Sequence, residues 1–300
     1  GLGDVYKRQS PGLSGISLCG KYRAARHNVT KCSRDRMGSS GIIDISLYNC
    51  LLFQGIRAEQ ERRNSMNFVI EHLSKAFEKK QVLKDITFTF DSGKIYGLLG
   101  RNGAGKTTLF NCLNRDLKTD GGDFFLQENG ERVELAAEDI GYVLSTPTVP
   151  EFLTGREFLK FFIDINEKSI ADIKALDEYF SIMNIDEEDR DRLLKDYSHG
   201  MKNKMQMLIN IIAQPKLLLL DEPLTSLDVV VAEEMKQLLR SLKKDRIIIF
   251  STHIMELALD LCDEIVILNH GELEVVDPSN LDNGGFKDKI IRALKEEEND

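Results

Sequence analysis

The sequence has 300 residues and a mass of 34.0 kDa, a length that predicts one to two domains. Hydrophobic residues make up 42% and charged residues 30%, and the apolar runs are far shorter than the roughly 20 residues that span a bilayer. These features argue against a channel or carrier, and a net charge of −9 argues against a nucleic-acid binder with a basic surface. Five cysteines without a CxxC pair fit neither a zinc ribbon nor a disulfide scaffold, so a cytosolic protein is expected.

The composition of the chain changes near residue 65. Residues 1–65 hold 11 Lys and Arg against 5 Asp and Glu, whereas the rest of the chain carries a net charge of −15. Residues 4–9 (DVYKRQ) resemble one reading frame of the mosaic-end adaptor used in transposase-based sequencing libraries, and residues 61–65 back-translate as a purine-rich ribosome-binding site. We therefore expect residues 1–65 to be a non-native, disordered translated leader and the gene product to begin at Met66. A disordered basic leader is the alternative.

From Met66 onward, strand and helix patterns alternate. Thr154–Glu157 fits a capping box at the start of a helix rich in Phe and Leu. Strands are predicted at residues 67–71, 86–90, 95–99, 123–126, 140–144, 217–220, 247–250 and 265–268. Helices are predicted near 106–117, after Thr154, after Asp228 and, with acidic composition, at 287–298. The alternation predicts an α/β domain with a largely parallel sheet, and the strand-free block at about 151–213 is predicted to be an inserted helical subdomain.

A glycine-rich motif joins the predicted strand at 95–99 to the helix that follows it. Residues 100–108 read GRNGAGKTT and match the P-loop pattern GxxxxGK[ST]. Phosphates must lie against backbone N–H groups, which requires glycines that tolerate positive φ and close approach, and the helix start adds its dipole. Lys106 is expected to reach the β- and γ-phosphates, and Thr107 to offer its hydroxyl to Mg²⁺. The residues predicted to bind the nucleotide here are Gly100, Asn102, Gly103, Ala104, Gly105, Lys106, Thr107 and Thr108; a glycine-rich turn without a ligand is the alternative.

A second motif, LLLLDEP at residues 217–223, places two carboxylates after a strand that is apolar on both faces. Open α/β sheets bind ligands at the carboxyl ends of their strands. Asp221 is therefore predicted to hold Mg²⁺ through water, and Glu222 to polarise an attacking water molecule. A strand followed by a helix cap is the alternative reading of these residues.

From Met66 to about Val276, the order and spacing of the motifs resemble those of ABC ATPases, specifically the nucleotide-binding subunits of ABC transporters. The matching positions are Phe77 for the aromatic that stacks on adenine, Tyr197–Met201 for the signature motif, Ser226–Asp228 for the D-loop and His253 for the switch histidine. The resemblance implies an α/β fold over residues 66–300, with a P-loop NTPase core, a mainly parallel sheet, an N-terminal antiparallel β subdomain and the inserted α-helical subdomain.

The resemblance also implies a mechanism. Two subunits, identical or different, would face each other head to tail, with ATP between the P-loop of one and Ser198, Gly200 and Asp228 of the other. Catalysis would rest on Glu222, His253 and Lys106. A separate ABC permease would dock on the helical block and on the loop after Leu144, so that the subunit lies on the inner face of the cell membrane. No nucleic-acid partner is expected.

Two positions depart from the family pattern. Ser145 follows the strand at 140–144. At this position the family has a glutamine that contacts Mg²⁺ and the attacking water, so Ser145 is the residue expected to contact the metal here. The signature has His199 for its first glycine and Met201 for its last glutamine. The segment still resembles the YSxGM variant of exporter-type subunits, and it predicts a working signature and transport outward.

Other functions explain less of the sequence. A soluble ABC ATPase of translation would need two nucleotide-binding halves, and one of DNA repair would need a long coiled-coil insertion. A P-loop kinase of small molecules would leave the signature, D-loop and switch residues without a role. Ser145 motivates a further alternative, an ATP-binding switch that closes but turns over slowly.

Overall fold

The computed structural model describes residues 66–78, 80–170, 173–224 and 227–276. The predicted leader at residues 1–65 and the predicted acidic helix at 287–298 lie outside the described residues. Within the described ranges, no helix combines the length and the apolar character needed to cross a membrane.

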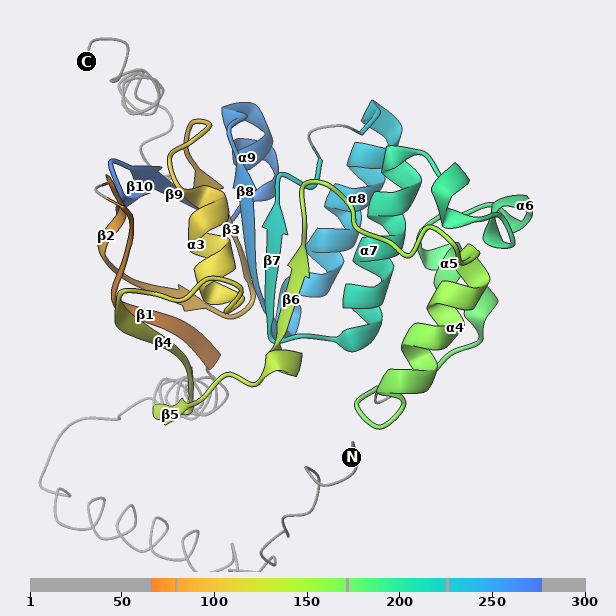
Figure 1. Ribbon diagram of the computed structural model, residues 1–300, viewed down its shortest axis with the longest axis horizontal. Helices are drawn as coiled ribbons and strands as arrows, with labels where there is room; N and C mark the ends of the chain where they lie inside the picture. Colours follow the sequence, from red (N-terminus) through yellow and green to blue (C-terminus); the bar gives the residue numbers. More distant parts are fainter. Residues whose placement is uncertain (1–65, 79, 171–172, 225–226, 277–300) are drawn as a thin grey trace, which may run out of the picture. The chain divides into compact units, whose positions relative to one another are not determined.

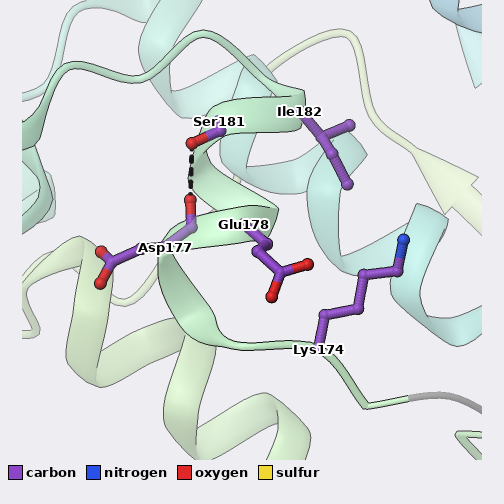
Figure 2. A pocket seen from close by; sticks show the side chains of 5 residues that line it. All are labelled: Lys174, Asp177, Glu178, Ser181 and Ile182. Carbon is purple, nitrogen blue, oxygen red and sulfur yellow. Dashed lines mark hydrogen bonds between the residues drawn. The ribbon is translucent and has the colours of Figure 1, made fainter.

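Two β-sheets organise the described residues (Figure 1). An antiparallel sheet has the order β2-β1-β4-β5 and comprises β1 (Met66–Phe77), β2 (Lys80–Asp91), β4 (Gly121–Glu128) and β5 (Glu131–Val133). A larger sheet has the order β10-β9-β3-β8-β7-β6 and comprises β3 (Lys94–Leu99), β6 (Ile140–Val143), β7 (Leu217–Asp221), β8 (Ile247–Thr252), β9 (Glu264–Asn269) and β10 (Glu272–Val276). Its neighbouring strands are parallel except for β9 and β10, so the predicted mainly parallel sheet and N-terminal antiparallel sheet are confirmed.

The helices fall into a core set and an inserted block. The core helices are α3 (Lys106–Leu113), α8 (Val229–Leu242) and α9 (Met255–Leu261), and the block holds α4 (Gly155–Asn166), α5 (Leu176–Ile182), α6 (Glu187–Arg190) and α7 (His199–Ala213). Short 3₁₀ turns lie at Ala137–Asp139, Leu194–Asp196 and Lys243–Asp245. In Figure 1, α3 lies between the two sheets, whereas α4, α5 and α6 lie beyond α7, away from the parallel sheet. The predicted helical subdomain is therefore present, and its described residues contain no strand.

The central strands are buried on both faces, as their uninterrupted apolar sequences predict. Along β7, Leu217 and Leu219 pack into a core shared by α3 and both sheets, whereas Leu218 and Leu220 pack into the core beneath the helical block. This period of two holds the strand rigidly between two cores, so the residue at its end, Asp221, has a fixed position.

Local signals explain where the helical block begins. Thr154 caps α4: its hydroxyl accepts from the Glu157 N–H at 3.1 Å, and the Glu157 carboxylate accepts from the Thr154 N–H at 2.9 Å. The predicted capping box is confirmed. It satisfies donors at the helix start that would otherwise lack intrahelical partners.

Several element boundaries differ from the prediction. Helix α3 ends at Leu113, four residues before the predicted Leu117, because the chain turns into the left-handed region at Arg115 (φ 64°). Strand β1 runs on to Phe77, past register irregularities after Ile70 that break the alternation used for prediction. Strands β5 and β10 were not predicted, since each is short and lies at a sheet edge with exposed residues.

Candidate nucleotide site

The P-loop occupies the turn between β3 and α3. Gly103 and Gly105 have φ of 83° and 105°, which disfavours other side chains there. A Cβ on Gly100 would lie 2.9 Å from the Leu268 carbonyl oxygen, and one on Gly105 would lie 2.9 Å from Cγ1 of Val82 on β2. The loop is therefore held between β9 and the β1–β2 hairpin. Gly105 is also the N-cap of α3, so no side chain competes for the N–H groups of the first helical turn.

Lys106 is the first residue of α3, and its side chain is buried beneath the loop. Its ammonium donates to the carbonyl oxygens of Gly100 at 2.6 Å and Arg101 at 3.1 Å, and it lies 3.5 Å from Oε1 of Glu222. Burial lowers the pKa of Lys106 below its ordinary value, and the nearby charge of Glu222 opposes that shift. The charge is thus held between the loop and the end of β7.

Asp221 joins three elements at the end of β7. Only 2% of the residue is exposed, and both carboxylate oxygens accept hydrogen bonds. The Thr107 hydroxyl donates to Oδ2 at 2.8 Å, and the Ser251 hydroxyl donates to Oδ1 at 2.6 Å. Because β7 and β8 are parallel and in register, Asp221 and Ser251 are direct neighbours. The carboxylate therefore has a fixed orientation toward the start of α3.

Glu222 leaves the sheet in an unusual backbone conformation, with φ of 48°. Its N–H donates to the Ser251 hydroxyl at 3.1 Å, and Oε1 lies 3.1 Å from Nδ1 of His253, just past the end of β8. Because Lys106 lies on the same oxygen, the carboxylate sits between an ammonium and an imidazole. The three residues predicted to be catalytic are thus neighbours.

Other predicted residues lie on the loop after β6, at the end of β1 and on the P-loop and α3. Ser145 is exposed and follows β6, and the pairing of Val143 with Leu220 brings this loop beside the end of β7. Phe77 ends β1, and its side chain is 45% exposed. Asn102, Ala104 and Thr108 belong to the loop and the first turn of α3, as predicted.

The residues of the predicted signature and D-loop lie on different elements. Ser198 is the N-cap of α7, and its hydroxyl accepts from the Met201 N–H at 3.2 Å, with Gly200 in the first turn. Asp228 caps α8 by accepting from the N–H groups of Val230 and Val231, each at 3.0 Å. The contacts of Ser198 and Asp228 are thus within their own helix starts, while Ser226 lies outside the described residues.

Sequence reasoning missed one member of the site. Ser251 belongs to none of the motifs that identify the site in the sequence, yet its hydroxyl connects the Asp221 carboxylate to the Glu222 backbone. A hydroxyl at the end of a buried strand is the available signal. It becomes informative only when β8 is known to be the neighbour of β7.

The donors at this site suit a magnesium-bound nucleotide. Thr107 and Asp221 present a hydroxyl and a buried carboxylate, and Mg²⁺ in proteins binds one or two such oxygen ligands together with substrate phosphates. Among the described residues no cluster of three or more His, Cys, Asp or Glu forms a metal cage. A strand, glycine loop and helix, with a buried aspartate at the end of a nearby parallel strand, define a P-loop protein that binds nucleoside triphosphates.

Comparisons with known proteins narrow this class. Residues 83–225 match the family described as ABC transporter. The chain is 34% identical to YdbJ of Bacillus subtilis, an uncharacterised ABC transporter ATP-binding protein, over 68% of this chain and 67% of that one. It is 30% identical to the sulfate/thiosulfate import ATP-binding protein CysA of Synechocystis, over 70% of this chain and 60% of that one. The chain therefore belongs to the ABC transporter family, as an ATP-binding subunit with an ATPase domain.

Solved structures agree on the fold. One is a dimeric ATP-binding cassette in a post-hydrolysis state, bound to ADP and Pi. It superposes with a TM-score of 0.60 at 18% identity, covering 70% of this chain and 99% of that one. The described architecture is thus that of an ABC ATPase.

Proposed function

We propose that this subunit binds and hydrolyses ATP to drive a separate membrane permease, and that it does so as a head-to-tail dimer. The observation that carries the proposal is the cluster around Asp221 and Glu222, in which Lys106, Thr107 and His253 converge within hydrogen-bond or ion-pair distance. This arrangement supports a site in which positive charge and a carboxylate would meet the end of a bound triphosphate.

Nucleotide binding is assigned to the loop and the hairpin beside it. The triphosphate would lie against the N–H groups of Gly103–Gly105 and the first turn of α3, with Lys106 on the β- and γ-phosphates. Thr107 and Asp221 would hold Mg²⁺, which, when bound, supplies positive charge that stabilises the phosphate oxygens. Phe77 would stack on the adenine.

Hydrolysis is assigned to Glu222 and His253. The Glu222 carboxylate would accept a hydrogen bond from the attacking water and orient it toward the γ-phosphorus. His253, whose Nδ1 lies 3.1 Å from Glu222, would hold that carboxylate in place. The water oxygen forms the new bond to phosphorus, the bond to the ADP oxygen breaks, and inorganic phosphate leaves. Positioning and charge stabilisation, rather than covalent catalysis, would supply the rate enhancement.

The dimer is inferred from the family pattern, together with the position of Ser198 and Gly200 on a different helix from the P-loop residues. They begin the 15-residue helix α7, whose N-terminus carries partial positive charge, whereas Lys106 begins α3. A second subunit in head-to-tail orientation would bring its Ser198 and Gly200 to the γ-phosphate bound by the first, with Asp228 of the D-loop at the same interface.

The permease would dock on the helical block and on the loop after Leu144. The block exposes large apolar side chains at Phe152, Phe161 and Ile165, of which 78%, 56% and 63% are exposed. Exposed apolar patches of this kind mark protein contacts. The subunit would then lie at the inner face of the cell membrane. Export stays a prediction, based on the resemblance of Tyr197–Met201 to exporter-type signatures.

Two substitutions test the assignment of binding and hydrolysis. Glu222→Gln should retain ATP binding, stall hydrolysis and accumulate an ATP-bound dimer in light-scattering chromatography. Lys106→Ala should lose ATP binding, because the buried ammonium is removed from the loop. The control is Glu233→Gln, at a half-exposed carboxylate that pairs with Lys236 on α8. Parental turnover in Glu222→Gln would remove the water-orienting role.

A second candidate function, a slowly turning ATP-binding switch, is favoured by Ser145. This side chain is exposed beside the end of β7 and is about two heavy atoms shorter than the glutamine of the family pattern. The measurement that separates the two functions is the ATPase rate of Ser145→Gln.

A further inference from the structure

The side chain of Phe77 has a charged neighbour on one side. The Lys75 ammonium lies 5.5 Å from the centroid of the Phe77 ring, within the range of a cation–π contact. Only 11% of the Lys75 side chain is exposed, although Phe77 itself is 45% exposed. A lysine side chain usually extends into water, so some other group must hold this one.

That group is the carboxylate of Asp120, which lies directly before β4. Oδ1 accepts from the Lys75 ammonium at 3.0 Å, and Oδ2 accepts from the Ala76 N–H at 2.7 Å. The Asp120 N–H donates to the Ser74 carbonyl at 2.9 Å. These bonds, that from the Ala76 N–H foremost, lower the pKa of Asp120 below its ordinary value. One residue thus contacts the three residues that precede Phe77.

The position of Asp120 matters because regular pairing fails here. The ladder between β1 and β4 ends at Ser74 and Gly121, and the pairing of β1 with β2 shifts register on both sides of Lys75. Beyond Ser74, the Ala76 N–H finds an acceptor in the Asp120 side chain instead of a β4 carbonyl. The Asp120 carboxylate therefore fixes the end of β1, which beyond Ser74 pairs with β2 but no longer with β4.

The hairpin is also fixed against the phosphate loop. Val82, on the strand that follows Phe77, would lie 2.9 Å from a Cβ on Gly105, so β2 contacts the P-loop directly. An aromatic ring at the end of this hairpin is consequently set at a defined place relative to the loop.

We infer that Asp120 is a positioning residue for the nucleotide base. Together with Lys75 it holds the Phe77 ring with one face backed by the ammonium and the opposite face presented to a purine. The inference rests on the proposed function, in which Phe77 contacts the base. Because stacking on an aromatic ring is available to every base, the platform adds affinity for ATP and GTP alike and does not select between them.

Kinetics separate this role from a general effect on folding. Asp120→Ala should raise KM for ATP and for GTP about fivefold with kcat within twofold, whereas inhibition by tripolyphosphate, which has no base, should be unchanged. Asp120→Asn keeps an acceptor and should give a smaller effect. Lys75→Met, which removes the cation and leaves the Ala76 bond, provides a second variant. The control is Asp85→Asn. The Asp85 carboxylate on β2 pairs with His72 on β1, so this variant removes a carboxylate from the same hairpin.

A double-mutant comparison tests whether Asp120 acts through the ring. In a Phe77→Ala background the Asp120→Ala effect on KM should fall below twofold. The sequence contains no tryptophan, so Phe77→Trp introduces a single tryptophan at the platform, which can be excited selectively over the seven tyrosines. Its emission should be quenched by ATP and GTP but not by tripolyphosphate, and Asp120→Ala should reduce the quench at a given nucleotide concentration.

The outcomes distinguish the two levels of inference. If Phe77→Ala leaves KM unchanged while Lys106→Ala abolishes ATP binding, the base-stacking role of Phe77 is wrong and the inference about Asp120 falls with it. If Phe77→Ala raises KM but Asp120→Ala and Lys75→Met do not, only the inference about Asp120 is overturned. A weakened tripolyphosphate inhibition, or an undiminished Asp120 effect without the ring, would assign Asp120 to the scaffold of the loop instead.

Discussion

Removing the Ser251 hydroxyl should destabilise the protein and misplace the carboxylates of the site. In Ser251→Ala the Asp221 carboxylate loses the donor to Oδ1, now at 2.6 Å, and the Glu222 N–H loses the acceptor now at 3.1 Å. Ser251 has no exposed surface and Asp221 is 2% exposed, so solvent does not readily replace the lost donor. A hydrogen bond to a charged group contributes about 1.5–3 kcal/mol, so we expect a loss of roughly 2–3 kcal/mol.

Thermal and chemical unfolding measure this loss. For a folded region of this size, 1 kcal/mol shifts Tm by about 2–4 °C, so Ser251→Ala should lower Tm by roughly 4–12 °C. The matched control is Ser241→Ala, on the exposed side of α8, where the hydroxyl donates to the Leu238 carbonyl at 2.6 Å. That variant should stay within about 0.5 kcal/mol of the parent.

The same substitution should affect metal use. Because Ser251 and Thr107 together orient Asp221, loss of one donor should raise the Mg²⁺ concentration needed for half-maximal ATPase activity, with a smaller change in nucleotide affinity measured without metal. The reasoning is refuted if Ser251→Ala unfolds within 0.5 kcal/mol of the parent and shows an unchanged Mg²⁺ dependence. That result would mean that the Asp221 orientation is set by Thr107 and the strand backbone alone.

Three further predictions concern other parts of the chain. Ser145→Gln should raise kcat with little change in KM. The increase should be up to about thirtyfold if a bridging water at Ser145 costs as much as ~2 kcal/mol in the transition state. An unchanged kcat in a folded variant would mean that the loop is built around serine. The thiols of Cys112 and Cys262 should resist iodoacetamide at pH 8 in the native protein, because burial raises both pKa values, that of Cys262 to about 12, and peptide mass spectrometry before and after unfolding checks this. A chain that begins at Met66 should bind ATP as tightly as the full sequence in calorimetry, and loss of binding would assign the first 65 residues a role.

The parts of the fold with strong local signals were predicted from sequence. Four consecutive leucines at 217–220 predict a strand buried on both faces, and the P-loop glycines predict a turn that other residues cannot adopt. The capping box at Thr154 fixes a helix start within four residues of sequence. In each case the interactions that decide the structure lie close together along the chain, so periodicity and residue type suffice.

Other features depend on neighbours that are distant in sequence. The end of α3 at Leu113 is followed by a left-handed residue at Arg115, which has no reliable residue signature when the residue is not glycine. The extension of β1 to Phe77 depends on pairing with β2, where Ala76 lies opposite Gln81 and Phe77 opposite Lys80. The Ala76 N–H also donates to Asp120, 44 positions away. The alternation used for prediction ends earlier, and the strand continues because residues outside that pattern pair with it.

The candidate site shows the same division between motif and partner. Lys106, Thr107, Asp221, Glu222 and His253 were found from their motifs, yet Ser251, which ties two of them together, was not given a role. Its importance arises from the strand order, because β8 is inserted between β3, which leads to the P-loop, and β7, which leads to the carboxylates. Ser251 on that middle strand pairs with Leu98 of β3 and with Asp221 of β7, so it lies beside both neighbouring strand ends. The role of Ser251 therefore arises from the order of the strands. The same role is expected in any sheet in which a strand lies between the one that leads to the phosphate loop and the one that ends in a buried aspartate, and ends level with both.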